Sequence, residues 1–254
     1  MTLNLRTSTS SKTFPLLRTE DLENDAKDFH HLPFYIQIHV SIKSTTRPGL
    51  PVTLATWRTP LERENNLKPQ HIEQQQNPQA SEDEEMPISS PVWLNSALTP
   101  LRSTTDPSKR AAPPALGWIT HRRGGFPRDL RESWDFITVP PDGRELTIKH
   151  FLPRKVLRFY RKGGGEGDAQ PEKGERFVIG PNTNALGTFW WRWGDLNGDL
   201  ANKKFRSDDW YDGKNDGGNQ ELSVGEEGLW LESEGVNGFG LTMEVENEAE
   251  VEFV

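Results

Sequence analysis

The chain has 254 residues, of which 33% are hydrophobic and 27% are charged, and it contains 22 glycines and 19 prolines. This composition predicts one ordered domain with an unusually large share of turns, loops and disorder. The formal charge of -8 argues against nucleic acid as a partner, because affinity for phosphate backbones rises with each Lys or Arg that displaces counterions.

The sequence contains no cysteine, which excludes disulfides, thiolate nucleophiles and zinc-thiolate sites. Residues 1–30 hold no apolar run of the signal-peptide kind, and no later stretch approaches the length of a membrane span. We therefore expect a cytoplasmic protein without a membrane partner.

Residues 1–31 are predicted to form a flexible N-terminal segment, and residues 32–254 the folded domain. Residues 32–43 (LPFYIQIHVSIK) alternate between apolar and polar side chains, which predicts a strand with one buried face. After a turn-forming run, residues 52–57 (VTLATW) predict a second strand, antiparallel to the first across the short loop.

Three segments are predicted to be disordered insertions. Residues 65–91 and 99–114 carry few apolar side chains and cannot bury enough surface to offset the entropy of ordering. Residues 163–174 are rich in glycine and charge and are typical of a flexible connection.

The second half of the chain contains further short segments with strand character, separated by turn signals such as PPDG at 140–143. These segments are 116–120, 134–139, 145–151, 175–180, 188–193, 228–232 and 240–254. A helix over 152–161 is an alternative for that stretch, but no segment shows a long 3.6-residue period with caps at both ends. Many short strands without helical periodicity predict an all-β fold, an antiparallel β-sandwich, with a barrel as the alternative.

The stretch PVTLATWRTPLE, residues 51–62, resembles small fungal domains of immunoglobulin-like shape and the N-terminal propeptide region of fungal deuterolysin metalloproteases. In that family a strand ends in a tPLD-like turn, which here is Thr59-Pro60-Leu61-Glu62, with Glu62 in place of the usual Asp. The basic loop and turn at 121–143 and the closing VEFV follow in the expected order, so that the resemblance spans 32–254. It implies a single immunoglobulin-like sandwich interrupted by the insertions. Protease activity is not implied, because the chain has no HExxH sequence.

The segment GTFWWRWGDL, residues 187–196, places three tryptophans in four positions. On a strand, Trp191 and Trp193 share one face, and we expect them in the core. Trp190 and Arg192 then point the other way and are the candidate ligand-binding pair, since an exposed indole can stack on a sugar. The hydrogen-bonding partners of such a ligand would be Asp195, Asn197 and Asp199.

No cofactor or metal site is predicted. Counted from Asp195, a calcium loop would need Gly at the sixth position and Glu at the twelfth, where the chain has Leu200 and Arg206. The six histidines show no metal-ligand spacing, and no serine lies in a G-x-S-x-G elbow.

These observations favour a non-enzymatic β-sandwich protein that acts as an interaction or accessory module, with a protein partner bound by loops or edge strands. Carbohydrate binding through the residues around Trp190 is a second hypothesis. An enzyme of unrecognised kind, with a site in a sandwich cavity, is a third.

Overall fold

The computed structural model describes most of the predicted domain together with the first residues of the chain. The described ranges are 1–16, 34–56, 59–62, 98–112, 129–132, 134–151, 158–163, 169–206, 228–235 and 240–254. Within them the protein is all-β, and the helical elements are the short 3-10 turns η1 (Leu130–Glu132) and η3 (Thr183–Ala185). No helix in this part of the chain is long and apolar enough to cross a membrane.

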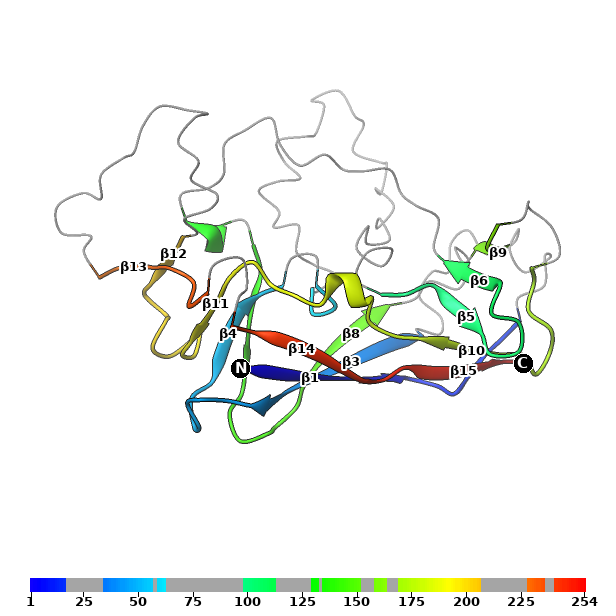
Figure 1. Cartoon of the computed structure of the whole chain (residues 1–254), viewed down its shortest axis with the longest axis horizontal. Coiled ribbons are helices and arrows are strands. Elements are labelled where there is room, and N and C mark those ends of the chain that lie inside the picture. The colour runs from blue at the N-terminus through cyan, green and yellow to red at the C-terminus, as the bar shows by residue number, and fades with distance from the viewer. Residues whose placement is uncertain are drawn as a thin grey trace, which may run out of the picture.

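The described strands form several sheets (Figure 1). A four-stranded sheet has the order β14 (Thr242–Asn247), β1 (Thr2–Thr9), β3 (Tyr35–Ser44) and β8 (Leu146–Phe151). A six-stranded sheet has the order β2 (Thr13–Phe14), β15 (Ala249–Phe253), β10 (Arg176–Ile179), β5 (Leu101–Ser103), β6 (Lys109–Ala112) and β9 (Arg158–Arg161). A three-stranded sheet consists of β11 (Trp191–Trp193), β4 (Val52–Ala55) and β7 (Phe136–Val139), and β12 (Lys204–Phe205) pairs with β13 (Trp230–Leu231).

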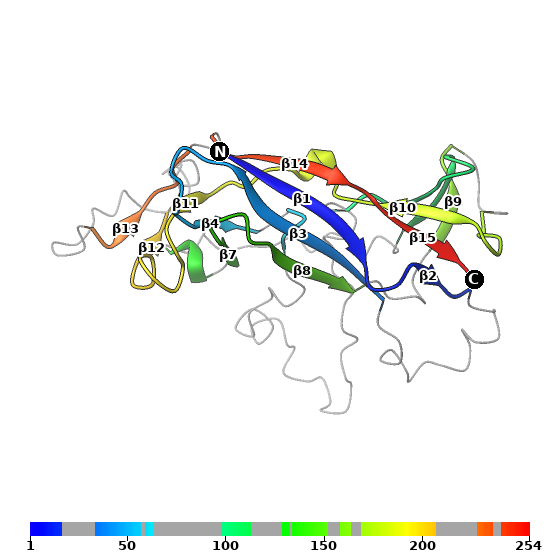
Figure 2. The same ribbon diagram turned by 90° about the horizontal axis from the view of Figure 1, so that it is seen from below.

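The two ends of the chain run together through both large sheets. β1 pairs in parallel with β14, and β2 pairs in parallel with β15, so that each end contributes a strand to each sheet (Figure 2). Leu3 and Leu5 of β1 are fully buried. The prediction of a flexible segment over 1–31 is therefore wrong for residues 1–16, while residues 17–31 lie outside the described ranges.

The side chain of Asn247 ends the parallel pairing of β1 with β14. Its Oδ1 accepts a hydrogen bond from the Thr7 backbone N–H at 2.9 Å, and its Nδ2 donates to the Thr7 carbonyl oxygen, also at 2.9 Å. The carboxamide thus satisfies the donor and the acceptor that a further strand residue would have paired. The register shifts at this point, between Leu5 and Arg6, and the chain continues into β15 in the other sheet.

The strand predicted over 32–43 is confirmed as β3, whose inward face includes Ile36, Ile38 and Val40, all fully buried. The strand predicted over 52–57 is confirmed as β4, but its pairing with β3 is wrong. β4 pairs with β7 and β11 in the three-stranded sheet, while β3 pairs with β1 and β8. A short loop joins strands of two different sheets here, because β1, distant in sequence, occupies the position beside β3.

The remaining strand predictions have mixed outcomes. The segments 134–139, 145–151, 175–180, 188–193, 228–232 and 240–254 each contain a strand, whereas 116–120 lies outside the described residues. The described end of the alternative helix, residues 158–161, is strand β9. The disorder predicted over 99–114 is wrong for residues 101–112, where β5 and β6 pair antiparallel and bury Leu101 and Ala111.

The other two predicted insertions are only partly testable. Residues 65–91 lie outside the described ranges, as do residues 164–168 of the segment 163–174. The rest of that segment is ordered: Ala169 is buried, and the Gly174 N–H donates to the Phe253 carbonyl at 2.7 Å. These contacts attach residues 169–174 to the end of β15.

The three-stranded sheet is covered on both faces. Val52 and Leu54 of β4 face the main core, which draws buried side chains from all three larger sheets. Ala55 faces a second cluster that contains Trp190 and Phe205. This explains why every residue of β4 is buried although its sequence alternates between apolar and polar positions.

A buried histidine fixes the turn that carries the family resemblance. The Thr59 hydroxyl donates to the Thr56 carbonyl at 2.7 Å and accepts from the Leu61 N–H at 3.1 Å, which places Leu61 in the core. His150, fully buried on β8, donates its Nε2–H to the Pro60 carbonyl at 2.7 Å. Burial lowers the pKa of His150 to about 4, against the opposing effect of that hydrogen bond.

The buried position of β1 predicts that Leu5→Ala lowers the free energy of unfolding by about 2–5 kcal/mol, the usual cost of truncating a core leucine. Urea denaturation followed by far-ultraviolet circular dichroism measures this loss. Lys12→Ala is the matched control, because Lys12 is exposed and only its backbone carbonyl is used, by the Glu252 N–H. Equal stability of both variants would show that the N-terminal strand is not part of the core.

His150 predicts a pH dependence of stability between about pH 6.5 and pH 4. The unfolded chain protonates this imidazole below its ordinary pKa of 6.5, whereas the folded protein keeps it neutral down to about 4. Stability is therefore fully present above pH 6.5 and falls as the pH drops through this window, by up to roughly 3 kcal/mol. The dependence of the denaturation midpoint on pH should flatten in His150→Gln and stay steep in His39→Gln, because the imidazole of His39 is partly exposed on the outer face of the sheet. Unchanged steepness in His150→Gln would assign the dependence to other groups.

Candidate functional site

Trp190, which precedes β11 and is the aromatic member of the predicted ligand-binding pair, is buried. Trp190 has no exposed surface, stacks on Phe205 with ring centroids 4.2 Å apart, and meets Phe136 edge to face. Its Nε1–H donates to the Arg206 carbonyl at 3.1 Å, which satisfies the indole donor. The exposed indole that sugar stacking would require is absent at Trp190, because a second apolar layer covers this side chain. Trp191 and Trp193 lie in the main core, as predicted.

The other predicted ligand contacts have structural roles or point apart. Arg192 is half-buried and donates to the Glu232 carbonyl at 2.9 Å. Asp195 starts a turn, since its side chain accepts from the Asn197 N–H at 2.8 Å and its carbonyl accepts from the N–H groups of Gly198 and Leu200. Asn197 and Asp199 are exposed in that turn. The turn places Leu200 in the second cluster. Because Trp190 lies in the same cluster, no indole is available at this position to stack on a sugar.

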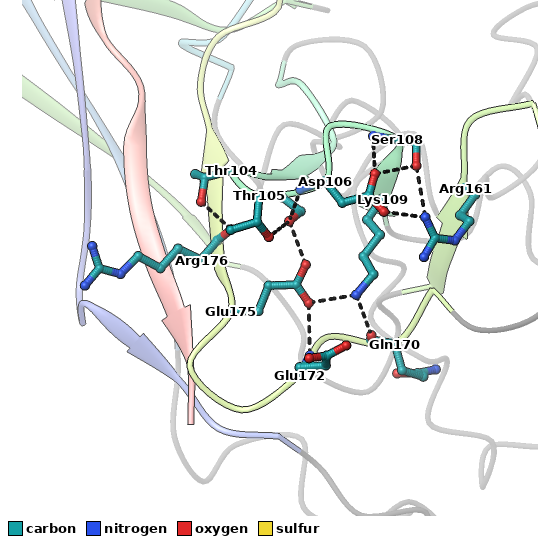
Figure 3. A network of polar contacts seen from close by, with 11 residues as sticks. Thr104, Thr105, Asp106, Ser108, Lys109, Arg161, Gln170, Glu172, Glu175 and Arg176 are labelled. Atoms are coloured by element: carbon teal, nitrogen blue, oxygen red, sulfur yellow. Dashed lines mark hydrogen bonds and ion pairs between the residues drawn. The ribbon is translucent and has the colours of Figure 1, made fainter.

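A dense polar network lies instead at the β5–β6 hairpin (Figure 3). Glu175 is its centre: one carboxylate oxygen accepts from the Ser103 hydroxyl at 2.6 Å, and the other accepts from Lys109 Nζ and the Glu172 N–H, both at 3.0 Å. The side chains of Lys109 and Glu175 are only 9% and 8% exposed. Burial raises the pKa of Glu175, but the hydrogen bonds from Ser103, Glu172 and Lys109 outweigh it and lower the pKa below its ordinary value.

The turn between the two strands forms the second half of this network. Asp106 accepts from the Ser108 hydroxyl at 2.6 Å and from the guanidinium of Arg161 on β9. The hydrogen bonds from Ser108 and Arg161 lower the pKa of Asp106 to about 2. The Asp106 N–H donates to Ser103 Oγ at 3.1 Å, which joins the two halves. The network therefore ties β5, β6, β9 and the loop before β10 into one rigid unit.

This network does not have the geometry of a catalytic site. The Ser103 hydroxyl donates its proton to a carboxylate that already accepts from an ammonium group, and no described contact joins this hydroxyl to an imidazole that could act as its base. Its contribution is to the shape of the hairpin. The opposite face of the same strands carries a different set of side chains.

The outward face of this end of the sheet carries a row of aligned side chains. Strand pairing places Arg102 of β5 opposite Arg110 of β6, and Arg110 opposite Tyr160 of β9. We call these three residues the Arg-Tyr row. Tyr160 is 36% exposed, one of the few large apolar side chains with that exposure in the described part of the chain, and the Arg102 side chain is 43% exposed.

Charge on this face changes from balanced to positive toward β9. Arg176 lies between Glu250 and Glu252, and Arg102 pairs with Glu248 at 2.7 Å. Arg110 has no acidic partner among the described residues. Arg102 is already compensated by Glu248, so the uncompensated positive charge that the described residues place on this face is that of Arg110.

Sequence reasoning missed both the network and the Arg-Tyr row, because residues 99–114 were predicted to be disordered. The sequence offers little signal here, because residues 101–103 read LRS and residues 109–112 read KRAA, and neither run alternates between apolar and polar side chains. In the described residues, no group of three His, Asp or Glu side chains could hold a metal ion.

The burial of Trp190 predicts that Trp190→Ala lowers the free energy of unfolding by about 3–5 kcal/mol, through the lost packing against Phe205 and Phe136. Chemical denaturation measures the loss. Asn197→Ala, in the exposed turn, should change stability by no more than about 0.5 kcal/mol. Unchanged stability of Trp190→Ala would show that this indole is not part of the core.

Comparison with known proteins supplies no relative for this chain. No family model, no curated protein and no solved structure matches it. The resemblance to the deuterolysin propeptide region stays a prediction.

Proposed function

We propose that this protein is a non-enzymatic interaction module, built as an immunoglobulin-like β-sandwich, that binds an extended acidic segment of a protein partner at the Arg-Tyr row. The sandwich form is supported by the shared main core, in which residues of the four-stranded sheet, such as Ile38, pack together with residues of the three-stranded sheet, such as Leu54.

The observation that carries the proposal is the opposed pair Arg102 and Arg110 beside an exposed Tyr160. Arginine and tyrosine are the residue types that contribute most binding energy at protein interfaces. A guanidinium group binds a carboxylate through two parallel hydrogen bonds, and such a contact would supply Arg110 with the acidic partner that the described residues do not give it. A carboxylate-bearing partner therefore fits this face better than a neutral one.

Strand addition is the binding mode that the topology favours. β9 is the last strand of the six-stranded sheet, and among the described residues it pairs with β6 alone. An extended segment added to the free edge of β9 would gain backbone hydrogen bonds and would lie directly beside Tyr160. Its outward acidic side chains would then be within reach of the long side chain of Arg110.

The polar network on the other side of these strands supports this role by limiting motion. Arg161 is held by Asp106 on the inner face, one residue after Tyr160. The turn that follows β9 is attached to the hairpin as well, since the Lys162 N–H donates to the Ser108 carbonyl at 2.9 Å. A surface that is rigid before binding loses less conformational entropy on association.

The proposal predicts that a short fluorescent peptide of alternating Glu and Val binds the protein, and that Arg110→Glu weakens this binding by about tenfold or more, or about 1.4 kcal/mol. Fluorescence anisotropy titration measures the affinity. Tyr160→Ala should also weaken binding, whereas a peptide of alternating Lys and Val should not bind.

Arg144→Glu is the matched control, because Arg144 lies in the exposed turn before β8 and its substitution makes the same change in net charge. If Arg110→Glu and Arg144→Glu weaken binding equally, the effect is one of total charge and the proposed site is wrong. Displacement of the peptide by a short oligonucleotide at lower concentration than by free peptide would assign the row to phosphate recognition instead.

A further inference from the structure

The outward face of the four-stranded sheet brings a serine and a histidine into direct contact. Ser8 Oγ on β1 lies 2.7 Å from His39 Nε2 on β3. On the other side of the same imidazole, Nδ1 lies 2.9 Å from the hydroxyl of Thr147 on β8, and strand register places His39 directly opposite Thr147. Three neighbouring strands therefore present a hydroxyl, an imidazole and a second hydroxyl in a continuous line.

Charged groups surround this line. Glu145 Oε2 is 3.8 Å from His39 Nδ1, and the carboxylate of Glu145 is held by two hydrogen bonds from Arg6, at 2.7 and 3.1 Å. Lys149 of β8 faces the same side, with its ammonium 5.9 Å from the centre of the Tyr35 ring. These are the charged groups that the described residues of β1, β3 and β8 place around the imidazole.

The position of the carboxylate selects one tautomer of the imidazole. A negative charge near Nδ1 favours the proton on that nitrogen, from which it is donated to Thr147. Nε2 is then an acceptor that faces Ser8. The Ser8 hydroxyl has a second acceptor, Gln37 Oε1 at 3.1 Å, but its contact with Nε2 is the shorter one.

From this arrangement we propose that Ser8 is an activated nucleophile, with His39 as its general base, that accepts an acyl or phosphonyl group from a small activated electrophile. Glu145 and Thr147 are positioning residues, since they orient the imidazole and do not touch the reacting atoms. This activity lies apart from the Arg-Tyr row, on the other large sheet.

The step balances without any further reactant. Ser8 Oγ attacks the carbonyl carbon of an aryl ester while His39 Nε2 takes the hydroxyl proton. The bond from the carbonyl carbon to the aryloxide breaks, and the aryloxide leaves with the proton from Nε2 as the phenol. With a fluorophosphonate, Oγ attacks phosphorus and fluoride leaves, while the proton stays on His39.

The geometry predicts stoichiometric labelling of this one serine. None of the contacts around Ser8 described above is a paired set of N–H donors for a tetrahedral oxyanion, and such donors are what rapid turnover requires. The expected product is thus a stable Ser8 ester, formed once per chain.

The test is to treat the full-length protein with a fluorophosphonate and to follow labelling of each serine by peptide mass spectrometry. Ser8 should react faster than Ser41, which lies on the same outward face, in β3, and is also partly exposed, so that it serves as an internal control. In His39→Gln the labelling rate of Ser8 should fall by about a hundredfold or more. The labelling rate should rise with pH to a plateau, and the midpoint of this rise should lie below pH 6.5. This follows because only the neutral imidazole accepts the proton, and burial and Arg6 lower the pKa of His39 while Glu145 raises it less.

Several outcomes would overturn the proposal. Equal labelling of Ser8 and Ser41 in the unmodified protein would do so without any variant. A His39→Gln protein that is folded by circular dichroism yet labels at the original rate would remove the imidazole as base. A labelling rate that keeps rising with pH and shows no midpoint below about pH 8 would indicate that hydroxide, and not His39, removes the serine proton.

Discussion

The parallel pairing of the two chain ends is the constraint on which the rest of the structure depends. β1 and β14 pair in one sheet, and β2 and β15 in the other, so both sheets are incomplete until the last residues of the chain have joined the first. Such contacts, separated by almost the full length of the chain, are costly to form because loop closure precedes any gain. They fix the relative position of the sheets, and hence of the Arg-Tyr row on one large sheet and of Ser8 and His39 on the other.

The second determinant is the burial of both faces of the three-stranded sheet. β4 lies between β7 and β11, and its alternate residues enter two different apolar clusters. The tryptophans of β11 follow the same rule: Trp191 and Trp193 enter the main core, and Trp190 enters the second cluster. A cluster of indoles that suggests a ligand site by composition is explained here by packing on both sides of one strand.

Alternation of apolar and polar residues predicted the long strands well, because β3 and β15 each bury one face over several residues. It failed where the partner layer is remote in sequence. Trp190 could not be predicted to be buried, because Leu200 and Phe205, which cover it, belong to a segment that reads as a polar loop. β1 was missed because only Leu3 and Leu5 provide its apolar signal, and Ser8 therefore could not be paired with His39.

The β5–β6 hairpin shows how a short element can be held in one conformation by polar contacts. A hairpin this short buries little apolar surface, so the charge-assisted network around Glu175 must provide much of its definition. A buried ion pair contributes little net stability compared with apolar packing, but loss of either partner leaves an uncompensated charge. The ion pair therefore selects one arrangement of the strands, and adds little to the overall free energy of folding. That specificity keeps Arg102 and Arg110 opposed on the outer face, where a relaxed hairpin would let them separate.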